Sequence, residues 1–201
     1  VPARNELNGG YAADGYARVK GLAALITTFG VGELSAVNAI AGAYSENVPI
    51  VHIVGSPKSQ KQKQQKLMHH TLMDGDFDAF RRVYEPISAY TAILTPDNAM
   101  VEIPKAIFIA KQTQKPVYLS VALDLVQQPI AVKALKLTPL KTSDSSLKSA
   151  MRHARKMLKA AKQVVVVSDA QVKSWKWQPL VRDLAEKMKV PVASTVMGKG
   201  G

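Results

Sequence analysis

Three short stretches of the sequence contain residue types that could bind a ligand or move protons. Glu6 lies in the first turn of a predicted helix, where the helix dipole favours a carboxylate. His69 and His70 are adjacent, and histidine is the side chain best placed to shuttle protons near neutral pH. Gly30 and Val31 stand between a predicted strand and a predicted helix, where bare backbone can approach a ligand closely. These residues favour proton-transfer and ligand-binding chemistry without identifying a reaction.

Each stretch also has a structural interpretation. Glu6 could simply be a surface residue that stabilises a helix start. Adjacent histidines in a loop are expected to point in different directions, so that at most one reaches a given ligand, and they could equally be hydrogen-bonded loop residues. A metal site is not expected around them, because no carboxylate or further histidine stands at ligand spacing. The segment at 74–76, Asp-Gly-Asp, is interpreted as a turn, since it lacks the alternating carboxylates of a calcium loop.

Several common site motifs are absent from the sequence. The glycines at 30 and 32 do not form a dinucleotide fingerprint, because Ser35 replaces the final glycine. A Gly-x-Ser-x-Gly nucleophile elbow is lacking, and the Met-Gly-Lys-Gly segment at 197–200 does not have the spacing of a phosphate-binding loop. The chain has no cysteine, which excludes disulfides, thiolate metal sites and a cysteine nucleophile.

The composition of the chain limits which classes of partner are expected. The chain has 201 residues, of which 47% are hydrophobic, and a formal charge of +12. A basic balance can indicate nucleic acid, but the lysines of residues 58–66 have no aromatic residue among them and no recognition motif is present, so no nucleic-acid partner is expected. No apolar run reaches the roughly 18 residues needed to cross a bilayer, so no membrane partner is expected. The N-terminus shows no apolar signal core, and the expected location is cytoplasmic.

The elements that must position these residues alternate between strands and helices. Short apolar runs predict strands at 22–29, 49–54, 87–94 and 116–122, and periodic segments predict helices at 5–19, 33–45, 77–84 and from Thr95 or Asn98 to Lys111. Pro104 should kink or shorten the last of these helices. Residues 58–66 are predicted to form a polar loop. The pattern predicts an α/β fold, a parallel sheet with helices on both faces.

The pattern lapses after residue 126. Residues 127–146 contain two prolines and several serines and threonines without a sustained period, which predicts a linker. Residues 147–201 then begin a second α/β domain, with helices at 147–161 and 175–188 and strands at 164–167 and 190–196. A unit of this size cannot bury both faces of its sheet, so we expect a truncated domain.

Taken together, the motifs resemble one family. They are Asn5-Glu6-Leu7-Asn8, then Tyr11-Ala12-Ala13-Asp14-Gly15-Tyr16-Ala17-Arg18, then Thr27-Thr28-Phe29-Gly30-Val31-Gly32-Glu33-Leu34-Ser35, and then His69-His70-Thr71-Leu72 with Gly75-Asp76-Phe77. In order and spacing they are similar to pyruvate and indolepyruvate decarboxylases through Leu125. The histidine pair and the glycine turn favour these thiamine-diphosphate-dependent 2-oxo-acid decarboxylases over the related acetolactate synthases.

The resemblance implies roles for the candidate residues. Glu6 would be catalytic, hydrogen-bonding the aminopyrimidine N1′ of thiamine diphosphate so that the cofactor can attack a 2-oxo acid. A buried carboxyl with a raised pKa would suit that role. His69 and His70 would shuttle protons and bind substrate. Gly30 and Val31 would face the cofactor, and Glu33 receives no catalytic role.

The resemblance also implies a domain assignment and what this chain lacks. Residues 1–126 would be the pyrimidine-binding domain without its first strand, and residues 147–201 the beginning of the central domain. The Pro-Gly-Asp loop of the first strand and the domain that holds the diphosphate through Mg are not in the sequence. The active site would form between two copies of the full-length chain, so this chain alone should not turn over. The alternative is a non-catalytic fragment or assembly module that keeps the fold without activity.

Overall fold

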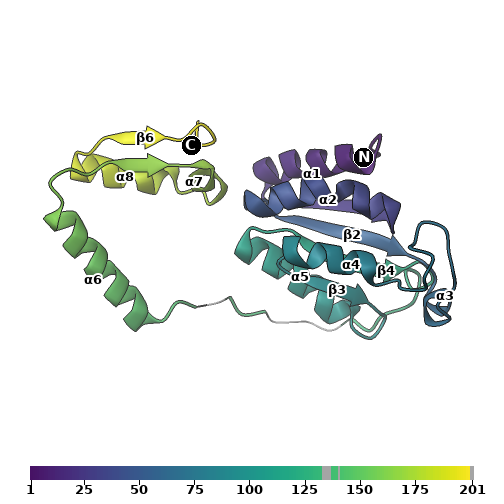
Figure 1. The fold of residues 1–201 in the computed structure, drawn as a ribbon. Coiled ribbons are helices and arrows are strands. Elements are labelled where there is room, and N and C mark those ends of the chain that lie inside the picture. The colour runs from purple at the N-terminus through teal and green to yellow at the C-terminus, as the bar shows by residue number, and fades with distance from the viewer. Residues whose placement is uncertain (133–136, 140, 200–201) are drawn as a thin grey trace. The chain divides into compact units, whose positions relative to one another are not determined.

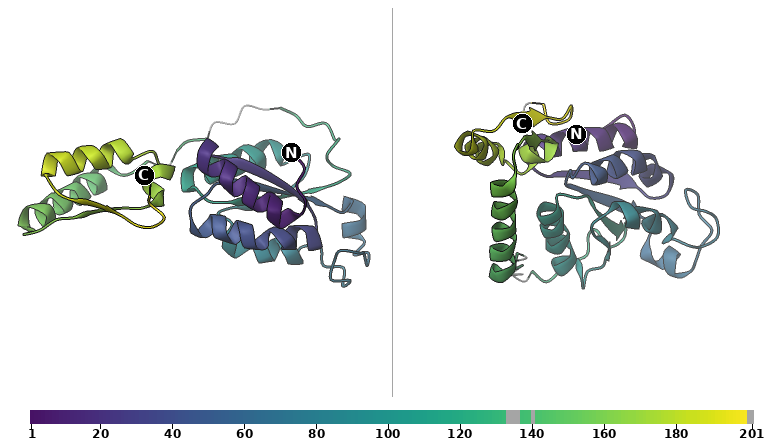
Figure 2. Two further views of the ribbon diagram at one scale, coloured as in Figure 1. Left: turned by 90° about the horizontal axis from the view of Figure 1, so that it is seen from above. Right: turned by 60° about the vertical axis from the view of Figure 1, so that its left-hand side comes forward.

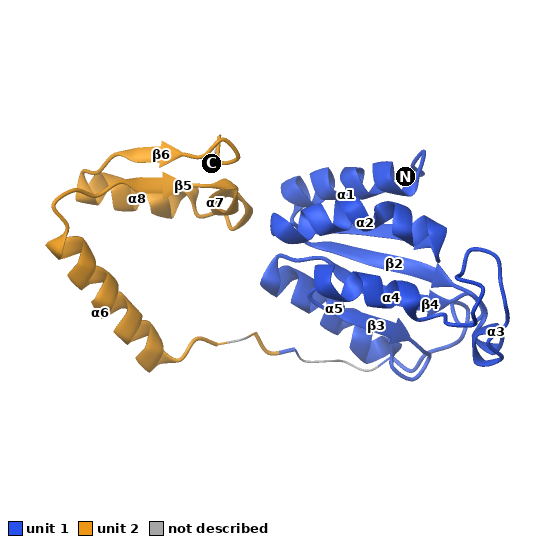
Figure 3. Ribbon diagram, in the orientation of Figure 1, with its two compact units in different colours: residues 1–137 blue, residues 138–201 orange. Residues whose placement is uncertain are grey.

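The computed structural model describes residues 1–132, 137–139 and 141–199. The chain divides into two compact units, residues 1–137 and residues 138–201 (Figures 1 and 3). The division falls inside the segment predicted as a linker, part of which lies outside the described residues. Each unit is described by itself. No helix among the described residues is both long enough and apolar enough to cross a membrane.

The first unit is built on a four-stranded parallel sheet with the strand order β1-β2-β4-β3. Its strands are β1 (Ala23–Thr28), β2 (Ile50–Ser56), β3 (Thr91–Leu94) and β4 (Val117–Ala122). Its helices are α1 (Glu6–Lys20), α2 (Val31–Ser45), α3 (Ser59–Lys63), α4 (Ala79–Tyr84) and α5 (Ala99–Thr113), with a 3-10 turn η1 (Glu85–Ile87). The predicted alternation of strands and helices is confirmed.

Helices cover both faces of this sheet, as predicted. On one face, α1 and α2 lie side by side and bury Leu25 and Ile50 of the strands together with Ile40 of α2 (Figures 1 and 2). On the other face, α5 packs against Val51 and Leu119. Side chains alternate between the two faces of each strand, so the continuous apolar runs of the sequence supply both cores.

The ends of the first helix follow from local chemistry. Asn5 is the N-cap of α1, and its Oδ1 accepts a hydrogen bond of 2.7 Å from the Asn8 backbone N–H. The helix ends at Gly21, whose φ of 87° is a left-handed conformation that glycine adopts without strain. These caps place Glu6 at the first helical position.

Several local predictions were wrong. The segment at 58–66 contains the short helix α3 and is not a continuous loop. Pro104 does not shorten α5, which runs on to Thr113, because a proline in the second turn removes only one intrahelical hydrogen bond. The predicted kink stays a prediction. The strand predicted at 87–94 is confined to β3, because η1 occupies the residues before it.

The second unit consists of α6 (Asp144–Ala160), β5 (Val166–Ser168), α7 (Ala170–Ser174), α8 (Gln178–Met188) and β6 (Val192–Ser194). The helix predicted at 175–188 begins only at Gln178, as α8, because Lys176 has a left-handed φ of 56°. The short helix α7 lies before the predicted range. The strands β5 and β6 pair in parallel. Among the described residues of this unit, Ala185 is the only buried hydrophobic side chain. The unit therefore leaves its sheet largely uncovered, as its size led us to expect.

Candidate active site

A cleft of about 790 Å³ lies at the carboxyl ends of β1 and β2, and Glu6 lines it. Glu6 is half-buried at the first position of α1. Thr28 and Ser56, the last residues of the two strands, also line the cleft. Open parallel sheets bind their ligands at this edge, because the strand ends and following loops form a crevice there.

The cleft combines apolar walls with a cationic group of side chains. Leu25, Ile26, Phe29, Met68 and Leu123 form the apolar part. Arg4, Lys58 and Lys61 supply positive charge. A flat ring with polar edges and an anionic group would match this lining, because rings pack on apolar side chains and anions are attracted to cations.

The turn between β1 and α2, residues 28–32, contributes Thr28 and Phe29 to the cleft and contains two tightly packed glycines. A Cβ added to Gly32 would lie 3.1 Å from Glu6 Oε1 and 2.5 Å from Thr28 Cγ2. Gly30 has a φ of 65°, and a Cβ there would lie 1.6 Å from the carbonyl oxygen of His70. We call residues 28–32 the glycine turn; it has room for no side chain at either glycine.

The histidine loop, residues 67–73, packs on the glycine turn. The rings of His69 and His70 lie side by side with their centroids 4.2 Å apart. The expectation that they point in different directions was therefore wrong. His70 has a left-handed φ of 68°, and this breaks the alternation of an extended chain. His70 is half-buried 6.0 Å from the ring of Phe29, whereas His69 is exposed.

Glu6 thus lies against Gly32 of the glycine turn, and His70 lies against Gly30. In the part of the chain that the structure describes, no hydrogen bond joins Glu6 to either histidine. Gly30 is buried under the histidine loop, Val31 is exposed, and the lining of the cleft stops at Phe29. The predicted contact of Gly30 and Val31 with the cofactor stays a prediction.

A buried polar cluster lies behind the turn. Glu33, only 2% exposed, accepts hydrogen bonds from the Gly30 N–H at 2.8 Å and from the Tyr118 hydroxyl at 2.7 Å. Its backbone carbonyl accepts from the Tyr84 hydroxyl. Burial raises the pKa of the Glu33 carboxyl above its ordinary value, and both hydrogen bonds counteract that rise. His52 packs against both tyrosine rings, which also pack against each other.

His52 is a further buried ionisable group of that cluster. It is 1% exposed, its Nε2 lies 2.9 Å from Thr27 Oγ1, and its Nδ1 has no hydrogen-bond partner. Burial lowers the pKa of the imidazole to about 3. His52 is therefore neutral at physiological pH. Its ring packs against Tyr84 and Tyr118 in the core. His52, His69 and His70 are all absent from the lining of the cleft.

The acidic segment at 74–76 is a turn, as predicted. Asp74 Oδ1 accepts a hydrogen bond of 2.9 Å from the Asp76 N–H, and Gly75 has a φ of 84°. The Asp76 carboxylate pairs with Arg82, which lowers the pKa of that carboxyl. Its carboxylate is thus committed to an ion pair at the start of α4.

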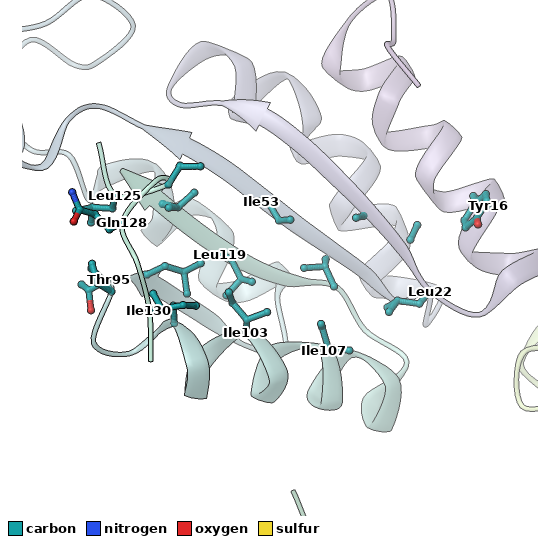
Figure 4. A pocket seen from close by; sticks show the side chains of 18 residues that line it. Tyr16, Leu22, Ile53, Thr95, Ile103, Ile107, Leu119, Leu125, Gln128 and Ile130 are labelled. Carbon is teal, nitrogen blue, oxygen red and sulfur yellow. The ribbon is translucent and has the colours of Figure 1, made fainter. Parts of the chain in front are cut away.

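A second hollow, an apolar groove of about 590 Å³, lies between α5 and the sheet (Figure 4). Ile103 and Ile107 of α5 face Ile53 and Leu119 of the strands across it. Among the described residues, no carboxylate, histidine, lysine or arginine lines it. Tyr16 is the one acid–base side chain among the described residues that line the groove, so the Glu6 cleft is the candidate active site.

Two domains of a known enzyme family match this chain. The N-terminal, cofactor-binding domain of thiamine pyrophosphate enzymes matches residues 1–79, and the central domain of the same enzymes matches residues 151–201. The first match includes Glu6, the glycine turn and both histidines. The chain belongs to the thiamine pyrophosphate enzymes.

Curated relatives match nearly the whole chain and show its similarity in more detail than the two domain matches do. The chain is 44% identical to pyruvate decarboxylase isozyme 2 of Saccharomyces cerevisiae and 44% identical to the pyruvate decarboxylase of Hanseniaspora uvarum, in each case over 98% of this chain and 36% of the relative. It is also 40% identical to a thiamine metabolism regulatory protein of Saccharomyces cerevisiae, over 98% of this chain and 33% of that protein. The chain spans about a third of the length of these relatives.

Proposed function

We propose that the whole protein decarboxylates a 2-oxo acid, pyruvate or a related acid such as indolepyruvate, to an aldehyde and carbon dioxide with thiamine diphosphate. The observation that supports this most directly is the position of Glu6. Its carboxyl lines a cleft at the carboxyl ends of two parallel strands, beside a glycine that leaves room for a ligand. Relatives named pyruvate decarboxylases match nearly the entire chain.

The residues present fit the aminopyrimidine half of the cofactor. A Cβ at Gly32 would crowd the Glu6 carboxyl at 3.1 Å, so the missing side chain keeps that carboxyl accessible. Apolar side chains such as Leu25 and Phe29 give a ring a surface on which to pack. When bound, thiamine diphosphate supplies the nucleophilic carbon and the electron sink for loss of carbon dioxide.

The chain's own groups have distinct tasks in this proposal. Glu6 would hydrogen-bond the aminopyrimidine ring nitrogen of the bound cofactor. His70 and His69 lie on the other side of the glycine turn and move protons to and from the substrate. The cations of the cleft, Arg4, Lys58 and Lys61, attract the anionic substrate.

Further parts of the proposal lie outside these residues. We propose that Mg and the diphosphate are held by a domain of the whole protein beyond this chain, and that a second copy of the full-length chain completes the site. Both follow from the resemblance to the decarboxylases. The 201-residue chain alone is then inactive, because it supplies one half of the site.

A second function is favoured by one comparison. The chain is 40% identical to a thiamine metabolism regulatory protein. The whole protein could then keep the fold without catalysing decarboxylation.

The two proposals are separated by assaying the full-length protein with thiamine diphosphate and Mg on pyruvate, indolepyruvate, phenylpyruvate and branched-chain 2-oxo acids. The decarboxylase proposal predicts cofactor-dependent release of carbon dioxide from at least one of them. Cofactor binding without turnover of any acid would contradict it and support the regulatory alternative.

A further inference from the structure

Glu33 is a buried carboxyl that lies outside the Glu6 cleft, yet both of its oxygens are engaged. Oε1 accepts from the Gly30 N–H at 2.8 Å, and Oε2 accepts from the Tyr118 hydroxyl at 2.7 Å. Burying a carboxyl without partners is costly, so these donors are what allow it to remain in the core. One donor belongs to the sheet and the other to the glycine turn. Glu33 therefore ties the turn to β4.

The hydrogen bond to Glu33 holds the Gly30 backbone, and the histidine loop packs against Gly30. Gly30 is the N-cap of α2, and Glu33 is the third residue of that helix. Glu33 thus performs the side-chain half of a capping box, reaching back to the N-cap N–H. The carbonyl of His70 lies 1.6 Å from where a Cβ of Gly30 would be. The Gly30 backbone is therefore packed closely against the His70 carbonyl, so that displacing Gly30 would disturb the histidine loop.

The same turn also faces Glu6. Gly32 precedes Glu33 in the chain, and its Cβ position is 3.1 Å from Glu6 Oε1. Displacing the turn would change the space around the Glu6 carboxyl and the placement of His70 together. Glu6 and His70 both lie against the glycine turn, and Glu33 is hydrogen-bonded to that turn.

We propose that Glu33 is a positioning residue of the active site, holding the glycine turn so that Glu6 and His70 keep their relative placement. This rests on the proposed decarboxylase function, since it concerns the groups of that site. Glu33 does not touch the cleft and acts through Gly30.

The first test is hydrogen exchange on the full-length protein without cofactor, read by mass spectrometry. Glu33→Ala should raise exchange in residues 28–32 and 67–73 about tenfold, because the Gly30 and Tyr118 donors lose their acceptor, while α5 stays unchanged. Glu33→Gln keeps an acceptor for Gly30 and should stay within about threefold of wild type in both segments.

Two further variants make the test specific. Tyr118→Phe removes one donor and should raise exchange in the same two segments by less than Glu33→Ala does; it also serves if the alanine variant does not fold. Glu102→Ala is the matched control, since Glu102 accepts from the hydroxyl of Tyr90 on another part of the unit. The control should leave residues 67–73 unchanged.

The second test is kinetic. In the active full-length protein, Glu33→Ala should lower kcat about ten- to a hundredfold with little change in KM, and Glu33→Gln should restore most of it. The proposal is overturned if Glu33→Ala leaves exchange of residues 67–73 unchanged, or raises it equally in α5, or if kcat stays at the wild-type level. An inactive wild type would instead refute the proposed function, and the exchange result would still decide the anchoring.

Discussion

The Glu6 cleft and the buried cluster around Glu33 both contact the glycine turn and use the same functional group differently. Glu6 is half-buried and lines open space, whereas Glu33 is 2% exposed with both oxygens hydrogen-bonded. A carboxyl whose oxygens are already engaged cannot serve a ligand. The comparison teaches that exposure and free hydrogen-bonding capacity, rather than charge alone, distinguish a chemical group from a supporting one.

The largest expected effect concerns acid stability of the buried cluster. His52 has its pKa lowered to about 3, whereas in the unfolded chain it titrates near 6.5. Between these values the unfolded chain binds a proton that the folded chain does not, so stability falls as pH falls below about 6.5, by about 1.4 kcal/mol per pH unit.

Urea unfolding at pH 6.5 and pH 4.5 measures this effect, with His52→Phe as the comparison. The wild type should lose about 2–3 kcal/mol more than the variant over that interval, because only the wild type has the titrating imidazole. Equal losses in the two proteins would show that His52 is not kept neutral by burial. Other acidic groups titrate in both proteins and cancel in the difference.

The next effect concerns the turn that separates the two regions. Gly30→Ala should lower the free energy of unfolding by about 2 kcal/mol or more, because the residue has a positive φ and its Cβ would collide with the His70 carbonyl. Gly15→Ala in α1 is the matched control, since nothing lies within 4 Å of its Cβ position. The free energy of unfolding of the Gly15→Ala variant should rise by about 0.5–1 kcal/mol, because alanine favours a helix more than an exposed helical glycine does. Similar changes in the free energy of unfolding of both variants would show that Gly30 is not under a special steric constraint in the turn.

The smallest effect is expected at the exposed charges of α1. Arg18 bonds Asp14 at 2.6 Å and Glu46 at 2.6 Å, on the surface of the unit. Exposed ion pairs contribute little because water screens them, so Arg18→Gln should change the free energy of unfolding by less than about 1 kcal/mol. Thermal or urea unfolding checks this, and a loss above about 2 kcal/mol would mean that surface charge rivals the buried cluster.

Much of the fold could be predicted from the sequence, because its determinants are local. The apolar runs around Ile53 and Leu119 and the cap at Asn5 are read from neighbouring residues. The role of Glu33 could not be predicted that way, since Tyr118 is 85 positions away along the chain. The available signal was a glutamate three residues after the glycine that begins a helix, which is half of a capping box.

The site was predicted unevenly for the same reason. Glu6 was found through its motif, and the structure places it in the cleft at the carboxyl ends of β1 and β2. The side-by-side arrangement of His69 and His70 was missed, because it depends on the left-handed backbone of His70, which no residue pattern encodes. The residues of the cleft wall, such as Phe29 and Met68, come together only through the sheet.

The most direct measurement of the central claim compares turnover and stability in one variant, Glu6→Gln, on the same preparation of full-length protein. The account predicts that turnover with thiamine diphosphate and Mg falls at least about a hundredfold, because the carboxyl is lost from the cofactor cleft. The free energy of unfolding should stay within about 0.5 kcal/mol of wild type, because Glu6 is half-buried and contributes no buried hydrogen bond. Turnover within about tenfold of wild type, or a loss of turnover that merely follows a loss of folded protein, would contradict the assignment of Glu6 to catalysis.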